Sequence, residues 1–176
     1  FSCELAKNNT IVMASEYRGG IDSEGKDHRG GDDINDVVKI KEIANQLPMC
    51  KQCKSIVAGF SRGGMMSYLL AKKEPWVKAV ISLAGTTDLI DSVKERPEMY
   101  EVFKEAFGGE DEEMKKRSAT SFYNEIPKDL PILMLHGTND ERVSVNQARK
   151  LYSLLNESGH SVEYKEFPNA DHDLLS

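Results

Sequence analysis

The sequence predicts an α/β fold in which a mostly parallel β-sheet carries helices on both faces. Short, continuous apolar runs, typical of strands buried on both sides, recur at residues 54–58, 78–84 and 131–135. Longer segments with apolar residues at helical spacing lie between them. Such alternation is the pattern of parallel sheets with crossover helices. At 176 residues, the chain (1–176) is expected to form a single domain around one core.

The N-terminal part is expected to supply a helix end, a strand and an amphipathic helix. Residues 1–8 have the pattern of a helix end, and the apolar run Thr-Ile-Val-Met-Ala at 10–14 predicts a strand. A polar, glycine-rich loop follows at 17–31; loops of that length are often functional. The aspartates at 32–33 can cap the next helix, which ends before Pro48. Its apolar face comprises Ile34, Val37, Val38, Ala44 and Leu47.

The pentapeptide Gly-Phe-Ser-Arg-Gly at 59–63 lies between the strand pattern at 54–58 and a helix pattern at 65–72. A serine at this corner, with glycine two places away on each side, is the nucleophile-elbow pattern of α/β-hydrolases, because the turn is too tight for larger side chains. The turn holds the Ser61 hydroxyl clear of the backbone, and the helix start offers N–H groups to a developing oxyanion. The alternative is a glycine-rich turn that contains serine by chance.

Residues 86–129 interrupt the alternation of strands and helices. The segment is rich in charge and is too long for a simple crossover, so we interpret it as a helical, lid-like excursion that roofs the site. A plain surface insertion is the alternative. The strand at 131–135 follows, then a helix that opens with the capping-box sequence at 144–147, and an alternating strand at 161–167 that Pro168 ends.

Three of these strands are followed by residues of the serine-hydrolase type. In open α/β sheets, active residues gather beyond the carboxyl ends of the strands. Ser61 follows one strand, Asp140 the next but one and His172 the last, and this is the chain order of α/β-hydrolases. A histidine removes the serine proton, and a carboxylate fixes the tautomer and stabilises the imidazolium. We therefore expect Ser61, Asp140 and His172 to be catalytic.

Other histidines and aspartates are weaker candidates. His160 precedes the last strand and is expected to be a solvated turn residue, whereas His136 is expected to support the site from behind. His28 lies in the glycine-rich loop and could approach the site. Asp88 follows the neighbouring strand and is the alternative acid, while Asp129 precedes its strand.

Four sequence segments, spread over nearly the whole chain, carry a resemblance to a known family. They are Tyr-Arg-Gly-Gly at 17–20, Gly-Phe-Ser-Arg-Gly-Gly at 59–64, His-Gly-Thr-Asn-Asp-Glu-Arg-Val at 136–143 and Pro-Asn-Ala-Asp-His at 168–172. They resemble the catalytic domain of the prolyl oligopeptidase family of α/β-hydrolases. The resemblance implies the Ser61, Asp140 and His172 triad, with the backbone N–H of Arg62 as one oxyanion donor.

The resemblance implies a serine hydrolase that cleaves an ester or a short peptide bond through an acyl-enzyme. Arg62 stands where the family more often has an aromatic residue, and these 176 residues contain no β-propeller segment. The sequence therefore resembles stand-alone peptidase-like esterases nearly as well, and the substrate stays open. A carboxylesterase of the same fold and a non-catalytic binding protein of that fold are the alternatives.

Composition narrows the set of partners. The net charge of −6 is spread along the chain without a basic stripe, and no apolar run approaches a membrane span, so neither nucleic acid nor membrane is an expected partner. Three cysteines, an odd number, favour a reducing compartment, and we expect a cytoplasmic protein. Cys50 and Cys53 lack further ligands at zinc spacing and do not stand at the start of a helix as a redox pair usually does, so a structural or incidental role is expected. No metal or cofactor is expected, and an oligomer is compatible with the sequence.

One strand of the resembled fold has no counterpart in the sequence. It ends in the oxyanion loop, precedes the helix expected at 1–8, and lies in the sheet between the strands expected at 10–14 and 54–58. We therefore expect the α/β-hydrolase sheet to lack its N-terminal strands, and the natural protein to continue before Phe1 and after Ser176, unless a partner strand fills the gap. Direct pairing of 10–14 with 54–58 would contradict this.

Overall fold

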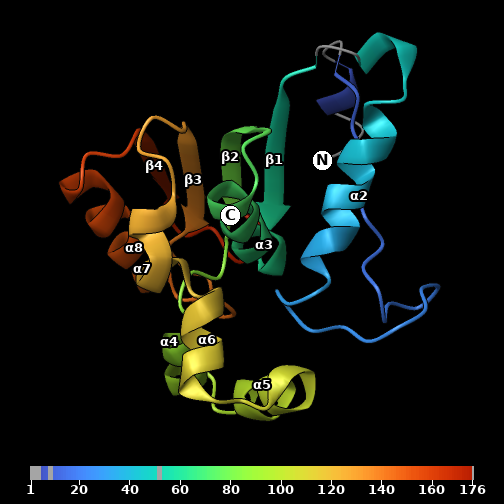
Figure 1. Ribbon diagram of the computed structural model, residues 1–176. Coiled ribbons are helices and arrows are strands. Elements are labelled where there is room, and N and C mark those ends of the chain that lie inside the picture. Colours follow the sequence, from blue (N-terminus) through green and yellow to red (C-terminus); the bar gives the residue numbers. More distant parts are fainter. Residues whose placement is uncertain (1–4, 8–9, 51–52, 176) are drawn as a thin grey trace. The chain divides into compact units, whose positions relative to one another are not determined.

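The computed structural model describes residues 5–7, 10–50 and 53–175 (Figure 1). The chain divides into two compact units, residues 1–53 and residues 54–176. Each unit is described by itself.

The second unit is built on a sheet of four parallel strands. Their order in the sheet follows the chain: β1 (Ser55–Phe60), β2 (Val77–Leu83), β3 (Ile132–Gly137) and β4 (Val162–Phe167). Ala58 lies opposite Ile81, and Gly137 lies opposite Phe167. Because every strand runs in the same direction, all four carboxyl ends meet at one edge of the sheet, as predicted.

Two crossover helices cover this sheet. α3 (Arg62–Lys73) packs on β1 and β2, and α8 (Val145–Glu157) packs on β3 and β4. The buried residues of α3 are mostly apolar, and Tyr68 and Met66 are among the largest side chains with almost no exposure. Right-handed crossovers that advance in one direction along a sheet place their helices on the same face. On β1, alternate residues are correspondingly exposed, with Ile56 and Phe60 on that exposed side.

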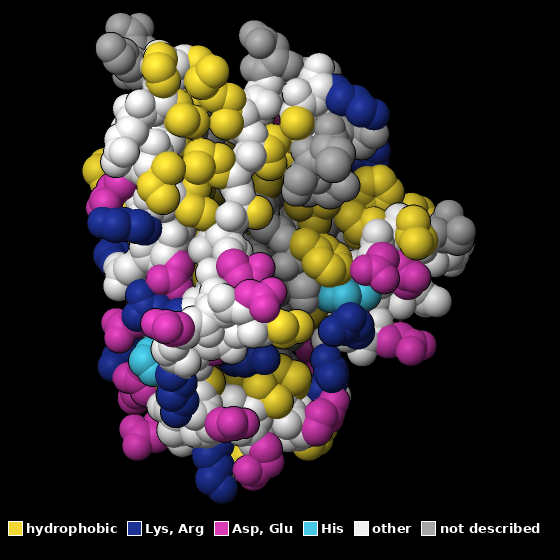
Figure 2. All heavy atoms as spheres, turned by 90° about the vertical axis from the view of Figure 1, so that its right-hand side faces the viewer, with side chains coloured by type: hydrophobic (Ala, Val, Ile, Leu, Met, Phe, Trp, Pro, Cys, Tyr) yellow, Lys and Arg dark blue, Asp and Glu magenta, His cyan; other side chains and the backbone are white. Residues whose placement is uncertain are grey.

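The excursion at 86–129 is helical, as predicted. It comprises α4 (Leu89–Glu95), α5 (Met99–Phe107), α6 (Asp111–Arg117), α7 (Ala119–Phe122) and a 3-10 turn (Tyr123–Glu125). Figure 1 shows α4, α5 and α6 gathered beyond the carboxyl ends of the strands. In the lowest part of the face drawn in Figure 2, at the height of these helices, positive and negative side chains are interspersed. A role as a lid stays a prediction.

Several aromatic rings of the excursion have packing partners. Phe103 and Phe122 are buried, and Phe103 stacks on Phe107 with 5.5 Å between the ring centroids. The Arg117 guanidinium lies 4.1 Å from the centroid of Phe107, and the Lys72 ammonium lies 4.3 Å from that of Phe122. Phe107 thus packs within the excursion, and Phe122 packs against Lys72 of α3.

The first unit contains α2 (Ile34–Ala44) and a 3-10 turn (Pro48–Cys50). α2 ends three residues before Leu47, at which the predicted helix ended. The side chain of Asp33 does not cap α2; it accepts the backbone N–H of Gly30 at 3.0 Å. The helix predicted at 1–8 lies mostly outside the described residues. Within the part that is described, Leu5 and Ala6 are helical.

The prediction of a strand at 10–14 is wrong, because this segment has no regular secondary structure. A strand is stable only when its backbone groups pair with a neighbour. Among the described residues, the sheet consists of β1 to β4, and the segment at 10–14 is not one of its strands. Apolarity alone therefore did not make this run a strand. The prediction of one domain over 1–176 stays a prediction.

Within the described residues, none of the helices has the length and apolarity needed to cross a membrane.

Candidate active site

Ser61 occupies a strained corner between β1 and α3. Its backbone angles are φ 54° and ψ −116°, outside the regions that L-residues usually adopt. The N–H of Ser61 donates to the carbonyl of Leu83 on β2 at 2.9 Å, and its own carbonyl accepts the N–H of Gly64 at 3.0 Å. The corner is thus tied to the next strand and to the first turn of α3. Strain of this kind, held by surrounding bonds, is typical of functional sites.

Close backbone approach explains two of the glycines around Ser61. A Cβ on Gly59 would lie 2.0 Å from the carbonyl oxygen of Gly63, and a Cβ on Gly64 would lie 2.6 Å from the Cα of Gly85. A Cβ on Gly63 would have nothing within 4 Å. The sequence pattern assigned the tight approach to Gly59 and Gly63, whereas the structure assigns it to Gly59 and Gly64.

The structure brings Asp140 and His172 together. Nδ1 of His172 lies 2.8 Å from Oδ2 of Asp140, and both side chains are almost wholly buried. Oδ1 of Asp140 accepts the backbone N–H groups of Arg142 and Val143, each at 2.9 Å. Since Nδ1 faces a carboxylate oxygen, Nδ1 carries the proton and Nε2 is left as the acceptor.

Burial disfavours the charged form of Asp140, but its hydrogen bonds outweigh this effect. Donation from His136, from the Val143 N–H, from His172 and from the Arg142 N–H holds the pKa of Asp140 well below its usual range. Asp140 therefore stays ionised next to His172 at neutral pH, and an ionised carboxylate stabilises an imidazolium.

Nε2 of His172 is buried and has no hydrogen-bond partner among the described residues. In particular, the structure shows no hydrogen bond between Nε2 and Ser61. Phe60, which immediately precedes Ser61, packs its ring against the His172 imidazole, with 4.8 Å between centroids and 50° between planes. The end of β1 and the loop that carries His172 are therefore adjacent. Sequence reasoning missed Phe60; its only signal was its place before Ser61.

The loop that carries His172 is fastened to the end of β3. The N–H of Asn139 donates to the carbonyl of Ala170 at 2.9 Å, and the N–H of Asn169 donates to the hydroxyl of Thr138 at 2.9 Å. A Cβ on Gly137 would lie 2.3 Å from the Ala170 carbonyl oxygen, so only glycine permits this approach. The two motifs that sequence reasoning placed in separate loops thus form one interlocked pair.

Arg62, the predicted oxyanion donor, is the first residue of α3. The backbone N–H groups in the first turn of a helix point out of its N-terminal end and have no intrahelical acceptor. The position beside Ser61 is the one that the elbow pattern requires of an oxyanion donor.

The structure gives the remaining candidates other partners. Asp88 caps α4, accepting two backbone N–H groups at 3.1 Å, and pairs with Lys150 at 2.7 Å. His28, in the first unit, lies 3.7 Å from Asp32. No cluster of three or more potential metal ligands occurs in the described part of the chain.

The interpretation of His160 as a solvated residue is wrong. His160 is buried; its Nδ1 meets the Ser158 hydroxyl at 2.9 Å, and its Nε2 meets the carbonyl of Ile126 at 3.0 Å. It joins the end of α8 to the end of the excursion. We predicted that His160 would be exposed because it lies just before a strand. Its contact with Ile126, 34 residues away in the sequence, buries it instead.

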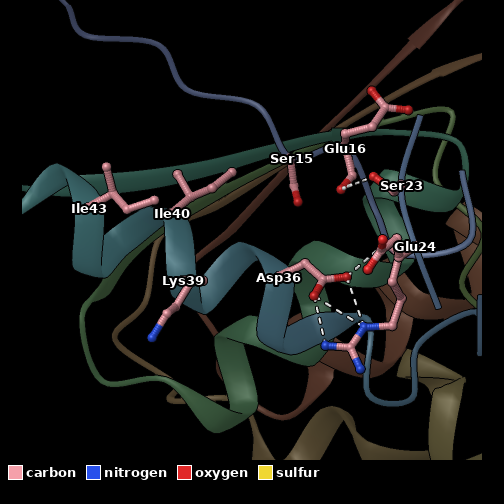
Figure 3. A pocket seen from close by; sticks show the side chains of 9 residues that line it. Ser15, Glu16, Ser23, Glu24, Asp36, Lys39, Ile40 and Ile43 are labelled. Carbon is pink, nitrogen blue, oxygen red and sulfur yellow. Dashed lines mark hydrogen bonds and ion pairs between the residues drawn. The ribbon is translucent and has the colours of Figure 1, made fainter.

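The first unit has a shallow hollow of about 340 Å³, shown in Figure 3, which contains none of the predicted catalytic residues. Its wall is fixed by an ion pair in which the guanidinium of Arg18 donates to Asp36 at 2.8 Å. These hydrogen bonds from Arg18 lower the pKa of Asp36.

A family model described as the prolyl oligopeptidase family matches residues 3–176. Among curated proteins, the chain is 29% identical over 165 residues to the uncharacterized peptidase YtmA of Bacillus subtilis (strain 168), covering 91% of this chain and 63% of that protein. It is 26% identical over 155 residues to the uncharacterized peptidase YuxL of the same organism, covering 82% of this chain and 22% of that protein. The chain thus spans less than two thirds of each of these relatives.

Solved structures of peptidases share this fold. An acylaminoacyl peptidase of Pyrococcus horikoshii superposes with a TM-score of 0.74 at 23% identity, over 84% of this chain and 24% of that one. A puromycin-hydrolyzing peptidase of Mycobacterium tuberculosis superposes with a TM-score of 0.66 at 18% identity, over 81% of this chain and 22% of that one. With the parallel sheet and its helices, these likenesses show an α/β-hydrolase fold of which the chain covers part.

Proposed function

The chain belongs to the prolyl oligopeptidase family, and on that premise we propose that it carries the catalytic triad of a serine peptidase, formed by Ser61, Asp140 and His172. The observation that supports this most strongly is the buried Asp140–His172 pair, whose base nitrogen, Nε2, makes no hydrogen bond within the described residues. That nitrogen belongs to a ring in contact with Phe60, the neighbour of the strained Ser61.

The proposed reaction proceeds through an acyl-enzyme. Ser61 Oγ attacks the carbonyl carbon of the substrate while Nε2 of His172 takes the hydroxyl proton, and the ionised Asp140 stabilises the resulting imidazolium. The backbone N–H of Arg62 donates to the oxyanion. The imidazolium then protonates the leaving group, and a water molecule, activated by the same nitrogen, releases the acyl group from Ser61. Ser61 and His172 need to form their hydrogen bond only in the substrate complex, because such bonds often tighten on binding.

We propose a short peptide, or a peptide with a blocked N-terminus, as the substrate class. Both curated relatives are described as peptidases, and one similar solved structure is an acylaminoacyl peptidase in complex with Z-Gly-Gly-Phe-chloromethyl ketone. A carboxylesterase is the second candidate, since the same triad hydrolyses esters and the two activities differ in pocket shape.

Turnover by three forms of the full chain tests this proposal. We expect the wild type to hydrolyse aminoacyl anilides as well as p-nitrophenyl esters, and Ser61→Ala to lose on the order of 10³-fold or more in kcat on both. Ser67→Ala is the matched control on the same helix, because its hydroxyl only bonds the carbonyl of Gly63 at 2.9 Å. Ester hydrolysis without anilide hydrolysis would identify the carboxylesterase instead. Activity retained by Ser61→Ala would remove Ser61 from the mechanism.

A further inference from the structure

We infer that His136 is a positioning residue that holds Asp140 for His172, an assignment that rests on the proposed triad. His136 lies on β3 and its side chain is 1% exposed, while that of Asp140 is wholly buried. Its Nε2 lies 3.1 Å from Oδ2 of Asp140, the same oxygen that faces His172 Nδ1 at 2.8 Å. Two imidazoles therefore share one carboxylate oxygen.

The surroundings of His136 determine where its proton lies. Nε2 has two acceptors within reach, Oδ2 of Asp140 and the carbonyl oxygen of Val143, the latter at 2.9 Å. Neither group can donate, so Nε2 carries the proton; it donates to the Val143 carbonyl and lies 3.1 Å from Oδ2 of Asp140. The protonated Nε2 of His136 thus faces the carboxylate oxygen that accepts from His172.

Val143 closes a ring between His136 and Asp140. Its carbonyl accepts from His136 Nε2, and its N–H donates to Oδ1 of Asp140 at 2.9 Å. With the N–H of Arg142 and the Nδ1–H of His172, three donors hydrogen-bond the carboxylate, and Nε2 of His136 lies 3.1 Å from Oδ2. A rotation of the Asp140 side chain would break the three bonds and the contact with His136 in a buried site. The arrangement fixes the direction in which Oδ2 faces His172.

His136 also affects the electrostatics of the shared oxygen. Its Nε2–H interacts favourably with the negative charge of Oδ2, so Oδ2 stabilises a His172 imidazolium less strongly than it would without His136. Glu166 lies opposite His136 on β4 and pairs with Arg149 at 2.7 Å. His136 therefore acts on His172 through Asp140.

A purely structural histidine would behave differently from a positioning one. His160 offers the comparison, because it is also buried and also bonds a backbone carbonyl, that of Ile126, but contacts no triad residue. Replacing either histidine removes buried hydrogen bonds and lowers stability. Only the replacement of His136 is expected to change the chemistry at His172.

The test compares three variants of the full chain with the wild type: His136→Gln, which keeps an N–H donor, His136→Met, which keeps the bulk without a donor, and His160→Met. Active sites are counted by fluorophosphonate titration, so that partial unfolding does not enter kcat. We expect His136→Met to lose about 10- to 100-fold in kcat with little change in KM, and His136→Gln to recover most of the loss. The acid limb of the kcat/KM profile should move to higher pH in His136→Met, because Oδ2 then serves His172 alone.

Wild-type kcat and an unchanged pH profile in His136→Met would overturn the inference, as would equal losses in His160→Met. A second readout does not depend on turnover: the NMR resonance of the His172 Nδ1 proton should move downfield in His136→Met but not in His160→Met. If this proton moves downfield in His136→Met but the wild type does not react with the fluorophosphonate, the proposed function is contradicted while the coupling through Asp140 is supported. No response of the proton would contradict the coupling itself.

Discussion

Asp140 is the residue whose ionisation links the site to the stability of the fold. Its pKa is held low in the folded state, so the unfolded chain binds a proton at a higher pH than the folded chain does. The stabilisation that its hydrogen bonds provide is therefore complete above the ordinary aspartate pKa of about 3.9 and is lost as the pH falls through the lower folded value.

Asp140→Asn provides the corresponding prediction. Between about pH 4 and pH 2, the free energy of unfolding of the wild type should fall more steeply than that of the variant, because only the wild type must protonate this carboxylate. Urea unfolding at several pH values measures the two slopes. Parallel slopes would show that Asp140 is not held ionised in the fold.

His160 shows how a single residue can be misread from sequence. Its imidazole bonds Ser158 and Ile126, so His160→Ala leaves buried groups without partners, at a cost of about 1–3 kcal/mol each in the free energy of unfolding. We expect a lower melting temperature and, per active site, unchanged turnover. A variant with the wild-type melting temperature would contradict the buried contact.

Among the helices and strands, the strand-turn-helix around Ser61 depends on Gly64 but not on its neighbour Gly63. Gly63 and Gly64 are neighbours on α3, but a Cβ on Gly64 would lie 2.6 Å from the Cα of Gly85 and 2.7 Å from the Ser82 hydroxyl, whereas a Cβ on Gly63 meets nothing within 4 Å. Alanine at either position gains the same helix propensity, up to about 1 kcal/mol.

These neighbours form a matched pair of variants. Gly63→Ala should leave the free energy of unfolding unchanged or raise it slightly, and Gly64→Ala should lower it by about 1–3 kcal/mol through overpacking against β2 and its following turn. Chemical denaturation of both variants gives the comparison. Equal effects would mean that α3 does not approach this turn as closely as described.

Gln147 shows where local motifs stop being informative. The sequence at 144–147 predicts a capping box, and Ser144 does accept the N–H of Asn146 at 3.3 Å. The side chain of Gln147, however, accepts the N–H groups of Thr87 and Asp88 at 3.2 Å and joins α8 to the excursion. The motif correctly predicts Ser144 as the capping residue. The orientation of the Gln147 side chain, however, depends on its hydrogen bond with Thr87, sixty residues away in the sequence.

At the scale of the whole molecule, the sequence predicted the second unit better than the first. Its four strands have strong apolar patterns and pair with one another, so each was located within a few residues. The segment at 10–14 is equally apolar, but its pattern could not supply the neighbouring strand that a sheet requires. The order of Ser61, Asp140 and His172 was visible in the sequence, whereas Phe60 and the shared oxygen of Asp140 depend on contacts that no local pattern encodes.

The labelling of Ser61 tests the central claim most directly. The full-length chain is treated with a fluorophosphonate, and intact mass and peptide mapping give the stoichiometry and the modified residue. We expect one adduct, on Ser61, with labelling slowed on the order of 10³-fold or more in His172→Ala because the hydroxyl then has no base. Absence of an adduct on the wild type, or an adduct on another serine that survives Ser61→Ala, would contradict it.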